Sequence, residues 1–250
     1  MKRYFILVLV ALISLSGCKV SDGTEIDPNG GKRTIWINTY ANLLESINGI
    51  SGRVVIYAAS ALSADKELQT LIEESYFKGK YSKYGVEVSG NSVVITTDVG
   101  KTKVITDGKS FAEGGVWQMY SVSTTSTGES VDIPKVICYG AGENRFTYSR
   151  TVKSGDKTTT VETEVSYTKA DGKVSLTIIG TGCEAGENYT IDFSSQLPNP
   201  IVFTNDLLDC GEVDIVYTDL ENKTNRSFSV KVVGNIHSFR DAYKNVIYTE

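Results

Sequence analysis

Histidine is nearly absent from this sequence, since His237 is the only one among 250 residues. Zinc sites are built mainly from histidine and cysteine at short, regular spacings, and no such spacing surrounds His237. A serine hydrolase could use a single histidine as its base, but the sequence has no Gly-x-Ser-x-Gly nucleophile turn. These absences argue against a zinc enzyme and a serine hydrolase. We expect His237 to lie in a loop before the C-terminal segment.

Other common catalytic and ligand-binding motifs are missing as well. Gly108-Lys109-Ser110 has the ending of a phosphate-binding loop, but Lys103 stands where that motif needs a glycine. Asp27-Pro28-Asn29-Gly30 lacks the remaining ligands of a calcium loop, and the carboxylates are too scattered to single out a catalytic pair. We therefore predict a protein that is not an enzyme, with no catalytic residue, no metal and no cofactor.

Positive charge is also in short supply. Residues 1–17 hold two of the 25 Lys and Arg and none of the 30 Asp and Glu, which leaves 23 basic against 30 acidic residues, a net charge of −7. Nucleic acids and anionic lipid surfaces are bound through clustered Lys and Arg, so this balance argues against nucleic acid as a partner. Lys78, Lys80 and Lys83 do lie close together, but the end of a predicted helix explains them.

Long hydrophobic runs are confined to the N-terminus. Residues 5–13 are all apolar and follow Lys2 and Arg3, but the run is shorter than the roughly 20 residues that span a bilayer. A basic start and a short apolar run followed by small residues are typical of a secretory signal peptide. The tetrad Leu15-Ser16-Gly17-Cys18 directly after the run resembles the lipobox of bacterial lipoproteins.

The resemblance to bacterial lipoproteins implies a specific fate for Cys18. In that family the cysteine thiol is joined to diacylglycerol, the peptide bond before it is cleaved, and the new amino terminus is acylated. Residues 1–17 would then be a signal peptide, and residues 18–33, which have no apolar period, a flexible tether. The lipid on Cys18 would make the membrane a partner and place the protein in the cell envelope. The outer membrane is favoured, with the periplasmic or surface side left open.

Two of the remaining cysteines could pair. Cys183 and Cys210 flank two predicted strands, residues 189–193 and 201–204, which are joined by the sequence Gln-Leu-Pro-Asn-Pro. If that sequence is a hairpin tip, antiparallel pairing would bring the two cysteines within reach of a disulfide. The alternative is two free thiols. Cys138 lies among apolar residues and is expected to be a small buried hydrophobic residue.

Helical periodicity marks the start of the body of the chain. Apolar residues recur every three or four positions over residues 40–47 and again over residues 64–77, and Ser63 can cap the second helix. Between them, residues 53–57 are rich in β-branched and aromatic side chains, which favours a strand, although the sequence Ala58-Ala59-Ser60-Ala61 that follows favours a helix. A short strand is also expected at residues 34–38.

From Gly85 onward the apolar period changes to two. Strands are expected at 86–88, 93–97, 102–106, 116–122, 133–139, 145–152, 158–168, 173–179, 189–193, 201–204, 213–218, 227–233 and 246–248. Asp107-Gly108 is typical of a two-residue hairpin. We predict one domain, residues 34–250, with a weak candidate boundary near 123–130. The fold class is mainly β: a single antiparallel β-meander sheet, sandwich or half-barrel, with two N-terminal helices packed on one face.

The order of elements over residues 38–120 is similar to that of the half-barrels of periplasmic lipoprotein carriers. The likeness consists of a helix, the strand predicted at 53–57, and the hairpins around Gly90 and Gly108; the long helix within residues 55–85 departs from it. The resemblance implies a curved sheet around a pocket for acyl chains. That pocket would lie between the sheet and three helical residues, Leu43, Leu71 and Ile72.

Three functional hypotheses follow from these observations. The first is a membrane-anchored envelope lipoprotein that binds or scaffolds an unidentified ligand, with its protein partners undetermined. The second is a half-barrel carrier of lipids or other apolar ligands. The third is a cell-surface protein that binds polysaccharide, which requires Trp36 or Trp117 to be exposed on a flat face for stacking; otherwise these indoles belong to the core.

Overall fold

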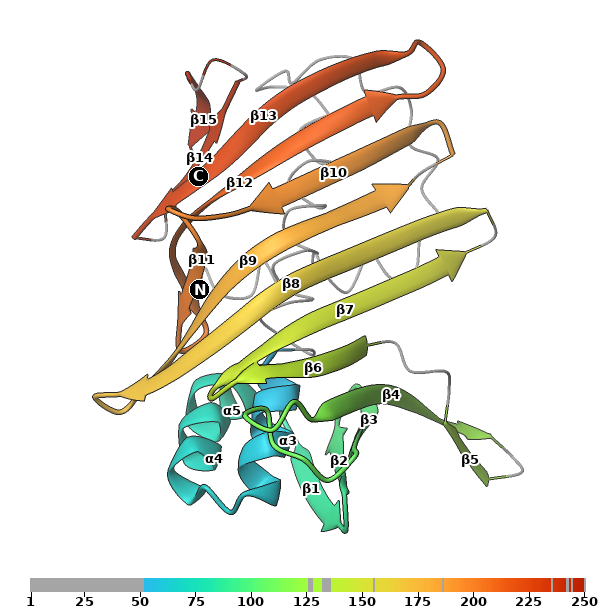
Figure 1. The fold of residues 1–250 in the computed structure, drawn as a ribbon, viewed down its shortest axis with the longest axis vertical. Coiled ribbons are helices and arrows are strands. Elements are labelled where there is room, and N and C mark those ends of the chain that lie inside the picture. The colour runs from blue at the N-terminus through green and yellow to red at the C-terminus, as the bar shows by residue number, and fades with distance from the viewer. Residues whose placement is uncertain are drawn as a thin grey trace. The chain divides into compact units, whose positions relative to one another are not determined.

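The computed structural model describes residues 52–125, 128–131, 136–154, 156–185, 187–234, 236–241, 243 and 245–249 (Figure 1). They belong to one compact unit, residues 42–250. The predicted signal peptide, Cys18, the tether, the strand at 34–38 with Trp36, and the helix at 40–47 lie outside the described residues.

The described strands form one antiparallel sheet, which confirms the predicted meander. They are β1 (Tyr84–Ser89), β2 (Ser92–Thr97), β3 (Gly100–Thr106), β4 (Val116–Thr125), β5 (Gly128–Val131), β6 (Val136–Gly142), β7 (Arg145–Ser154), β8 (Lys157–Ala170), β9 (Lys173–Ala185), β10 (Tyr189–Ser195), β11 (Ile201–Thr204), β12 (Leu207–Asp219), β13 (Thr224–Val233), β14 (Ile236–Arg240) and β15 (Val246–Thr249). Strands pair in chain order, except that β5 lies beside β4 and β11 beside β9 and β12. Because all of these strands join one sheet, the described residues do not form a sandwich.

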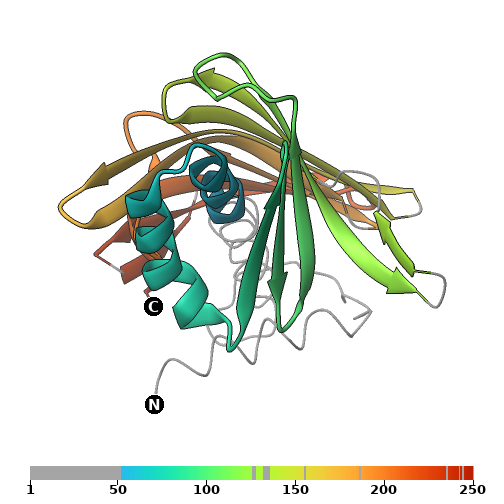
Figure 2. The same cartoon turned by 90° about the horizontal axis from the view of Figure 1, so that it is seen from below.

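The sheet is curved, and two helical segments lie against its concave side (Figure 2). The first is α3 (Val54–Leu62), which contacts β2. The second runs through α4 (Lys66–Ile72), a π-helical turn η2 (Glu73–Phe77) and α5 (Lys78–Lys80), and α4 contacts β9. Two helices packed on one face of a single sheet agree with the predicted fold class.

Helix α3 stands where a strand was expected, so that prediction is wrong. Val54, Val55 and Ile56 are buried, as are Tyr57 and Ala58. Propensity is a weak guide when nearly every side chain of a short segment is buried, because packing then decides the backbone conformation.

The predicted helix at 64–77 is present, but it begins at a different cap. The Asp65 carboxylate accepts a hydrogen bond from the Leu68 backbone N–H at 3.0 Å, whereas the Ser63 hydroxyl donates to the Ala59 carbonyl at 2.9 Å. Ser63 therefore belongs to the end of α3. Between the two helices, Ala64 adopts a left-handed conformation with φ of 58°.

Buried side chains face one another across successive strands, which places the core on one face of the sheet. The opposed pairs are Val93 with Val104, Val104 with Met119, Met119 with Val136, Cys138 with Tyr148, Phe146 with Val165, Val165 with Ile178, Phe193 with Ile215 and Val213 with Val230. Cys138 is fully buried, as expected, and burial raises the pKa of its thiol.

At two places in the sheet, a single strand pairs with two other strands, which follow one another along its length. β4 pairs with β6 through residues 116–119 and with β5 through residues 122–125. The weak candidate boundary near 123–130 coincides with the β4–β5 pairing, within the one compact unit of residues 42–250. In the same way, β9 pairs with β10 through residues 180–185 and with β11 through residues 175–178.

This second arrangement separates the cysteines that were predicted to pair. β10 and β11 follow one another along β9, so the proline-containing connection between them is not a hairpin tip. Cys183 of β9 lies opposite Asp192 of β10. Cys210 of β12 lies opposite Val202 of β11, and Val202 in turn lies opposite Thr177 of β9, six residues from Cys183. Six residues along a strand are about 20 Å, far beyond disulfide reach. Cys183 and Cys210 are free thiols, and the disulfide prediction is wrong.

His237 lies in β14, not in a loop as expected. It pairs with Val232 of β13. A strand as short as β14 gives little periodic signal, and its glycine- and asparagine-containing approach suggested a loop.

Candidate functional site

A cavity of about 470 Å³ lies between the corner that joins α3 to α4 and one end of the sheet. Its walls come from that corner, the β1–β2 turn, the β3–β4 loop, the β6–β7 turn and β8. The volume falls within the range of about 300–1,000 Å³ that is typical of small-molecule sites. We call it the Trp117 cavity after the tryptophan in its lining.

Aromatic side chains form part of the buried lining of the Trp117 cavity, beside Ser60 and Thr106. Phe111, Trp117 and Tyr167 all line it and are buried, together with Leu68. Phe111 lies against Trp117 with ring centroids 5.0 Å apart, and stacks on Phe146 at 4.9 Å. One side of the Trp117 indole is thus occupied by Phe111.

The indole N–H of Trp117 is a buried donor without a hydrogen-bond partner among the described residues. The side chain is only 4 % exposed. An unpaired buried donor costs about 1–3 kcal/mol, because its hydrogen bond to water is lost and nothing replaces it. The Nε1 atom has almost no accessible surface, so it is closed off from the cavity as well as from bulk water.

The loop that carries Phe111 is longer than the two-residue hairpin predicted at Asp107-Gly108. Thr106 and Trp117 are the last paired residues of β3 and β4, so residues 107–115 form the connection. The Asp107 carboxylate accepts from the Lys109 N–H at 3.0 Å. Glu113 accepts from both the Ser110 N–H and its hydroxyl, at 2.9 and 2.7 Å. The Asp-Gly sequence therefore opens a loop stabilised by its own side chains.

Two glycines let this loop lie directly on the sheet. A Cβ atom at Gly115 would stand 2.2 Å from the Lys109 carbonyl oxygen, and one at Gly140 would stand 2.4 Å from the Phe111 carbonyl oxygen. The Gly140 N–H donates to the Gly115 carbonyl at 2.8 Å. Close backbone approach at these positions holds Phe111 in the cavity lining.

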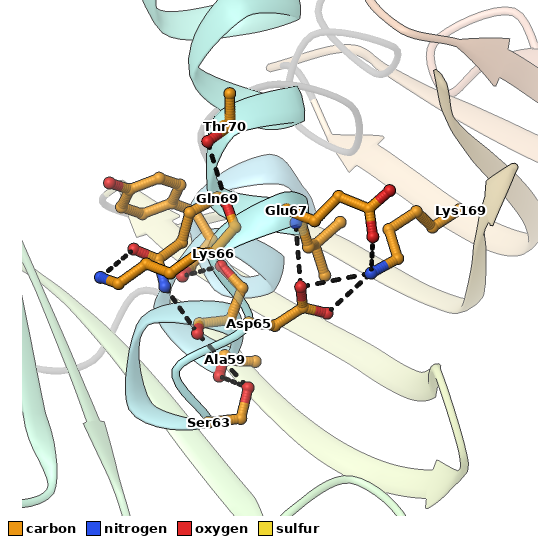
Figure 3. A network of polar contacts seen from close by, with 11 residues as sticks. Ala59, Ser63, Asp65, Lys66, Glu67, Gln69, Thr70 and Lys169 are labelled. Atoms are coloured by element: carbon orange, nitrogen blue, oxygen red, sulfur yellow. Dashed lines mark hydrogen bonds and ion pairs between the residues drawn. The ribbon is translucent and has the colours of Figure 1, made fainter. Parts of the chain in front are cut away.

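A polar network stabilises the wall of the Trp117 cavity that the α3–α4 corner forms (Figure 3). Lys169, from β8, lies 3.2 Å from the Asp65 carboxylate and 2.8 Å from Glu67. The Gln69 amide donates to the Ser60 carbonyl at 2.9 Å. The hydrogen bond from Leu68, followed by the contacts with Lys169, lowers the pKa of Asp65. The network joins the start of α4 both to α3 and to the sheet.

Asp65→Ala should destabilise the protein by about 1 kcal/mol at pH 7, the usual cost of losing an N-cap. The exposed ion pair with Lys169 adds little. Because the folded-state pKa is lowered, this contribution is present above the ordinary value of 3.8 and is lost as the pH falls below it. Urea denaturation at pH 7 and pH 3 measures the loss of stability in Asp65→Ala and how that loss changes with pH. Glu87→Ala, at an exposed carboxylate on β1, is the control; an equal loss there, or no convergence at pH 3, would contradict the account.

Polar side chains surround the opening of the Trp117 cavity. Asn91, Lys109, Glu143 and Asn144 are all exposed lining residues that come from three different connections. The Asn144 carbonyl accepts from the Tyr167 N–H at 2.9 Å, which ties the β6–β7 turn to β8. Burial, with smaller contributions from two nearby carboxylates, raises the pKa of Tyr167 to about 12.

Comparison with known proteins leaves the site to be interpreted from its own geometry. The chain matches no protein-family model, and no curated protein or solved structure is significantly similar to it. In the part of the chain that the structure describes, no helix has the length and apolar character needed to cross a membrane. No three His, Cys, Asp or Glu side chains gather there as a metal site would require.

The structure gives different roles to the residues that the sequence singled out. Trp117 is buried, so it does not form the flat stacking surface that the polysaccharide hypothesis required. Ile72 is fully buried, and neither Ile72 nor Leu71 lines the Trp117 cavity; Leu43 lies outside the described residues.

The sequence patterns did not single out Tyr167 and Glu143, which also line the cavity. Alternate turns of a meander meet at the same end of the sheet, and that rule could have grouped the turns around Gly90, Gly108 and Asn144.

A second cavity of about 260 Å³ lies between α3, the β2–β3 hairpin and β4. Val54, Phe77, Tyr81 and Ile95 contribute to its walls. Its volume is below the usual range for small-molecule sites, and its lining residues show no unpaired buried donor comparable to Trp117.

Proposed function

We propose that this chain is a non-enzymatic lipoprotein of the bacterial cell envelope, anchored through Cys18, whose β-rich unit binds a small ligand in the Trp117 cavity. The lipobox-like tetrad supports the anchor and the envelope location. The observation that carries the binding role is a cavity of ligand size with buried aromatic side chains in its lining and polar side chains at its opening.

The titratable groups of the cavity favour binding over acid–base catalysis. The hydrogen bonds from Ser110 lower the pKa of Glu113, and those from Leu68 and Lys169 lower that of Asp65. Burial moves the pKa of Tyr167 upward, to about 12. A general acid or base works best with a pKa near the working pH, whereas these three groups are shifted away from neutrality. Each keeps one protonation state at pH 7, which suits a fixed set of hydrogen-bond partners.

A carrier of apolar ligands is the second candidate. The curved sheet with helices on its concave side supports it (Figure 2), and the smaller cavity beside Phe77 would be its site. The Trp117 cavity fits this role less well, because an acyl chain would bury the polar groups at its opening without pairing them.

Blocking the Trp117 cavity should abolish ligand binding. Ala112 is exposed and lines the cavity, so Ala112→Trp places a large side chain there without entering the core. We expect at least one class of envelope small molecule (neutral sugars, amino acids, short peptides or fatty acids) to raise the Tm of the lipidated protein by several degrees, as saturating ligand does. The Ala112→Trp variant should show no such increase.

The matched control is Leu220→Trp, which adds an indole at another exposed position. Its Tm increase should equal that of the unmodified protein. The proposal fails if no class of molecule raises the Tm, or if Ala112→Trp responds like the control. Turnover of any of these molecules by the purified protein would contradict the non-enzymatic role.

A further inference from the structure

Negative charge predominates around the Trp117 cavity. Its lining contains three carboxylates, those of Asp65, Glu113 and Glu143, and one ammonium group, that of Lys109. Two of these carboxylates also act on Tyr167: after burial, the charges of Asp65 and Glu143 are the next causes that raise the pKa of its phenol. A site of negative potential attracts a ligand of positive charge and repels an anion.

The lysines near the cavity do not cancel this excess. Lys169 lies 3.2 Å from the Asp65 carboxylate and 2.8 Å from that of Glu67, so it faces two carboxylates at once. Lys109 also faces two, the carboxylates of its own β3–β4 loop. Backbone hydrogen bonds are the main cause that lowers the pKa values of those two groups, and the Lys109 charge adds to it. Each ammonium group is therefore shared between two carboxylates.

Glu143 keeps its charge uncompensated at the opening of the cavity. Its side chain is exposed and makes no hydrogen bond or ion pair with the other described residues. Arg145 lies two positions further along the chain, but it precedes Phe146, whose ring is buried in the core, so its own side chain points to the other face of the sheet. Its guanidinium donates to the Ala141 carbonyl at 2.7 Å and lies 3.7 Å from Glu164.

The spacing of the lining carboxylates suits an extended cation. They come from three different connections, and within the described ranges no three acidic, His or Cys side chains converge as metal coordination requires. A single metal ion could not contact all three. The apolar part of the lining, which includes Leu68 and Phe111, offers a surface to a carbon chain.

We infer that the Trp117 cavity binds a small organic cation, an ammonium group carried on a short carbon chain, as in a diamine or a basic amino acid. This inference rests on the proposed binding function and adds the class of ligand. The ammonium group faces Glu143 and the other lining carboxylates, and the carbon chain lies against the apolar lining.

Four probes of similar length separate charge from size. Lysine is norleucine with an ammonium group at the end of the chain, cadaverine is lysine without its carboxylate, and hexanoate is norleucine without its amino group. Each is titrated by calorimetry into the lipidated protein in an uncharged detergent at low salt, where exposed charges are least screened. We expect cadaverine to bind most tightly, lysine to bind more weakly, and norleucine and hexanoate not to bind.

Three substitutions at exposed side chains test where the cation binds. Glu143→Gln should weaken cadaverine binding about fivefold, the upper end for one exposed charge pair. Lys109→Gln should tighten it by a similar factor, because it removes a charge of the same sign as the ligand. Glu162→Gln should leave it unchanged: this exposed carboxylate lies between Val161 and Thr163, whose side chains are buried, so it is on the other face of the sheet.

Several results would overturn the cation assignment: no binding of cadaverine and lysine, equal binding of cadaverine and norleucine, or equal cadaverine affinity in Glu143→Gln and Glu162→Gln. The proposed binding function would still stand if another class of molecule raised the Tm and Ala112→Trp abolished that increase. If neither the four probes nor the other classes raise the Tm, both proposals fail.

Discussion

Replacing Cys18 with serine should move the whole protein out of the membrane fraction and abolish its labelling with palmitate. A serine hydroxyl is a much weaker nucleophile than a thiolate, so the thioether to diacylglycerol cannot form. Stable anchoring requires more than one acyl chain, each contributing about 0.8 kcal/mol per buried methylene. Fractionation of cells grown with labelled palmitate measures both results.

Cys210→Ser is the matched control for this experiment. Cys210 is an exposed, free thiol, so it tests whether any accessible cysteine accounts for the label. This variant should remain in the membrane fraction and carry the full label. Membrane-bound, palmitate-labelled protein from the Cys18→Ser variant would contradict the lipoprotein assignment.

Gly140→Ala should destabilise the protein by about 3 kcal/mol, the upper end of the range for overpacking a well-fitted interior. The new Cβ atom would stand 2.4 Å from the Phe111 carbonyl oxygen and 2.7 Å from the Phe111 Cα, and both are backbone atoms that cannot rotate away. The β3–β4 loop must then lift, which displaces Phe111 from the Trp117 cavity. Urea denaturation measures the loss in the free energy of unfolding.

Gly85→Ala provides the comparison, because Gly85 is also a strand glycine and a Cβ atom there would meet nothing within 4 Å. Its free energy of unfolding should stay within about 0.5 kcal/mol of the unmodified protein, as for most surface substitutions. Equal effects of the two substitutions would show that the loop does not depend on close contact at Gly140.

The sequence could predict most of the sheet because alternation is a local property. β8 and β9 alternate apolar and polar residues over many positions, and turn residues separate them, so a one-residue shift would expose their core. The segment at Val54 could not be predicted in this way. Its conformation depends on burial from several sides, which local propensity does not describe.

Errors in pairing had a different origin. The disulfide prediction assumed that neighbouring strands in the chain pair with each other, but β10 and β11 both pair with β9 and follow one another along it. The hairpin predicted at Asp107-Gly108 assumed the shortest connection, whereas Glu113 and Gly115 stabilise a longer loop. In both cases the deciding contacts are made between residues that sequence patterns do not relate.

The candidate site was only partly accessible to sequence reasoning. Trp117 was singled out, but as a surface for stacking, whereas it is buried and lies against Phe111 of the β3–β4 loop. Tyr167 reads as an ordinary inward-facing strand residue, and Glu143 as a turn residue. They become neighbours only in the folded structure, where three turns, β8 and the α3–α4 corner line the same cavity.

The most direct test of the central claim, ligand binding in the Trp117 cavity, is a crystal structure with the small molecule that raises the Tm most. The account predicts electron density for that molecule in this cavity, in contact with Phe111, Tyr167 and Asn144. Density for the molecule at another place, or a cavity closed by its own side chains, would contradict it.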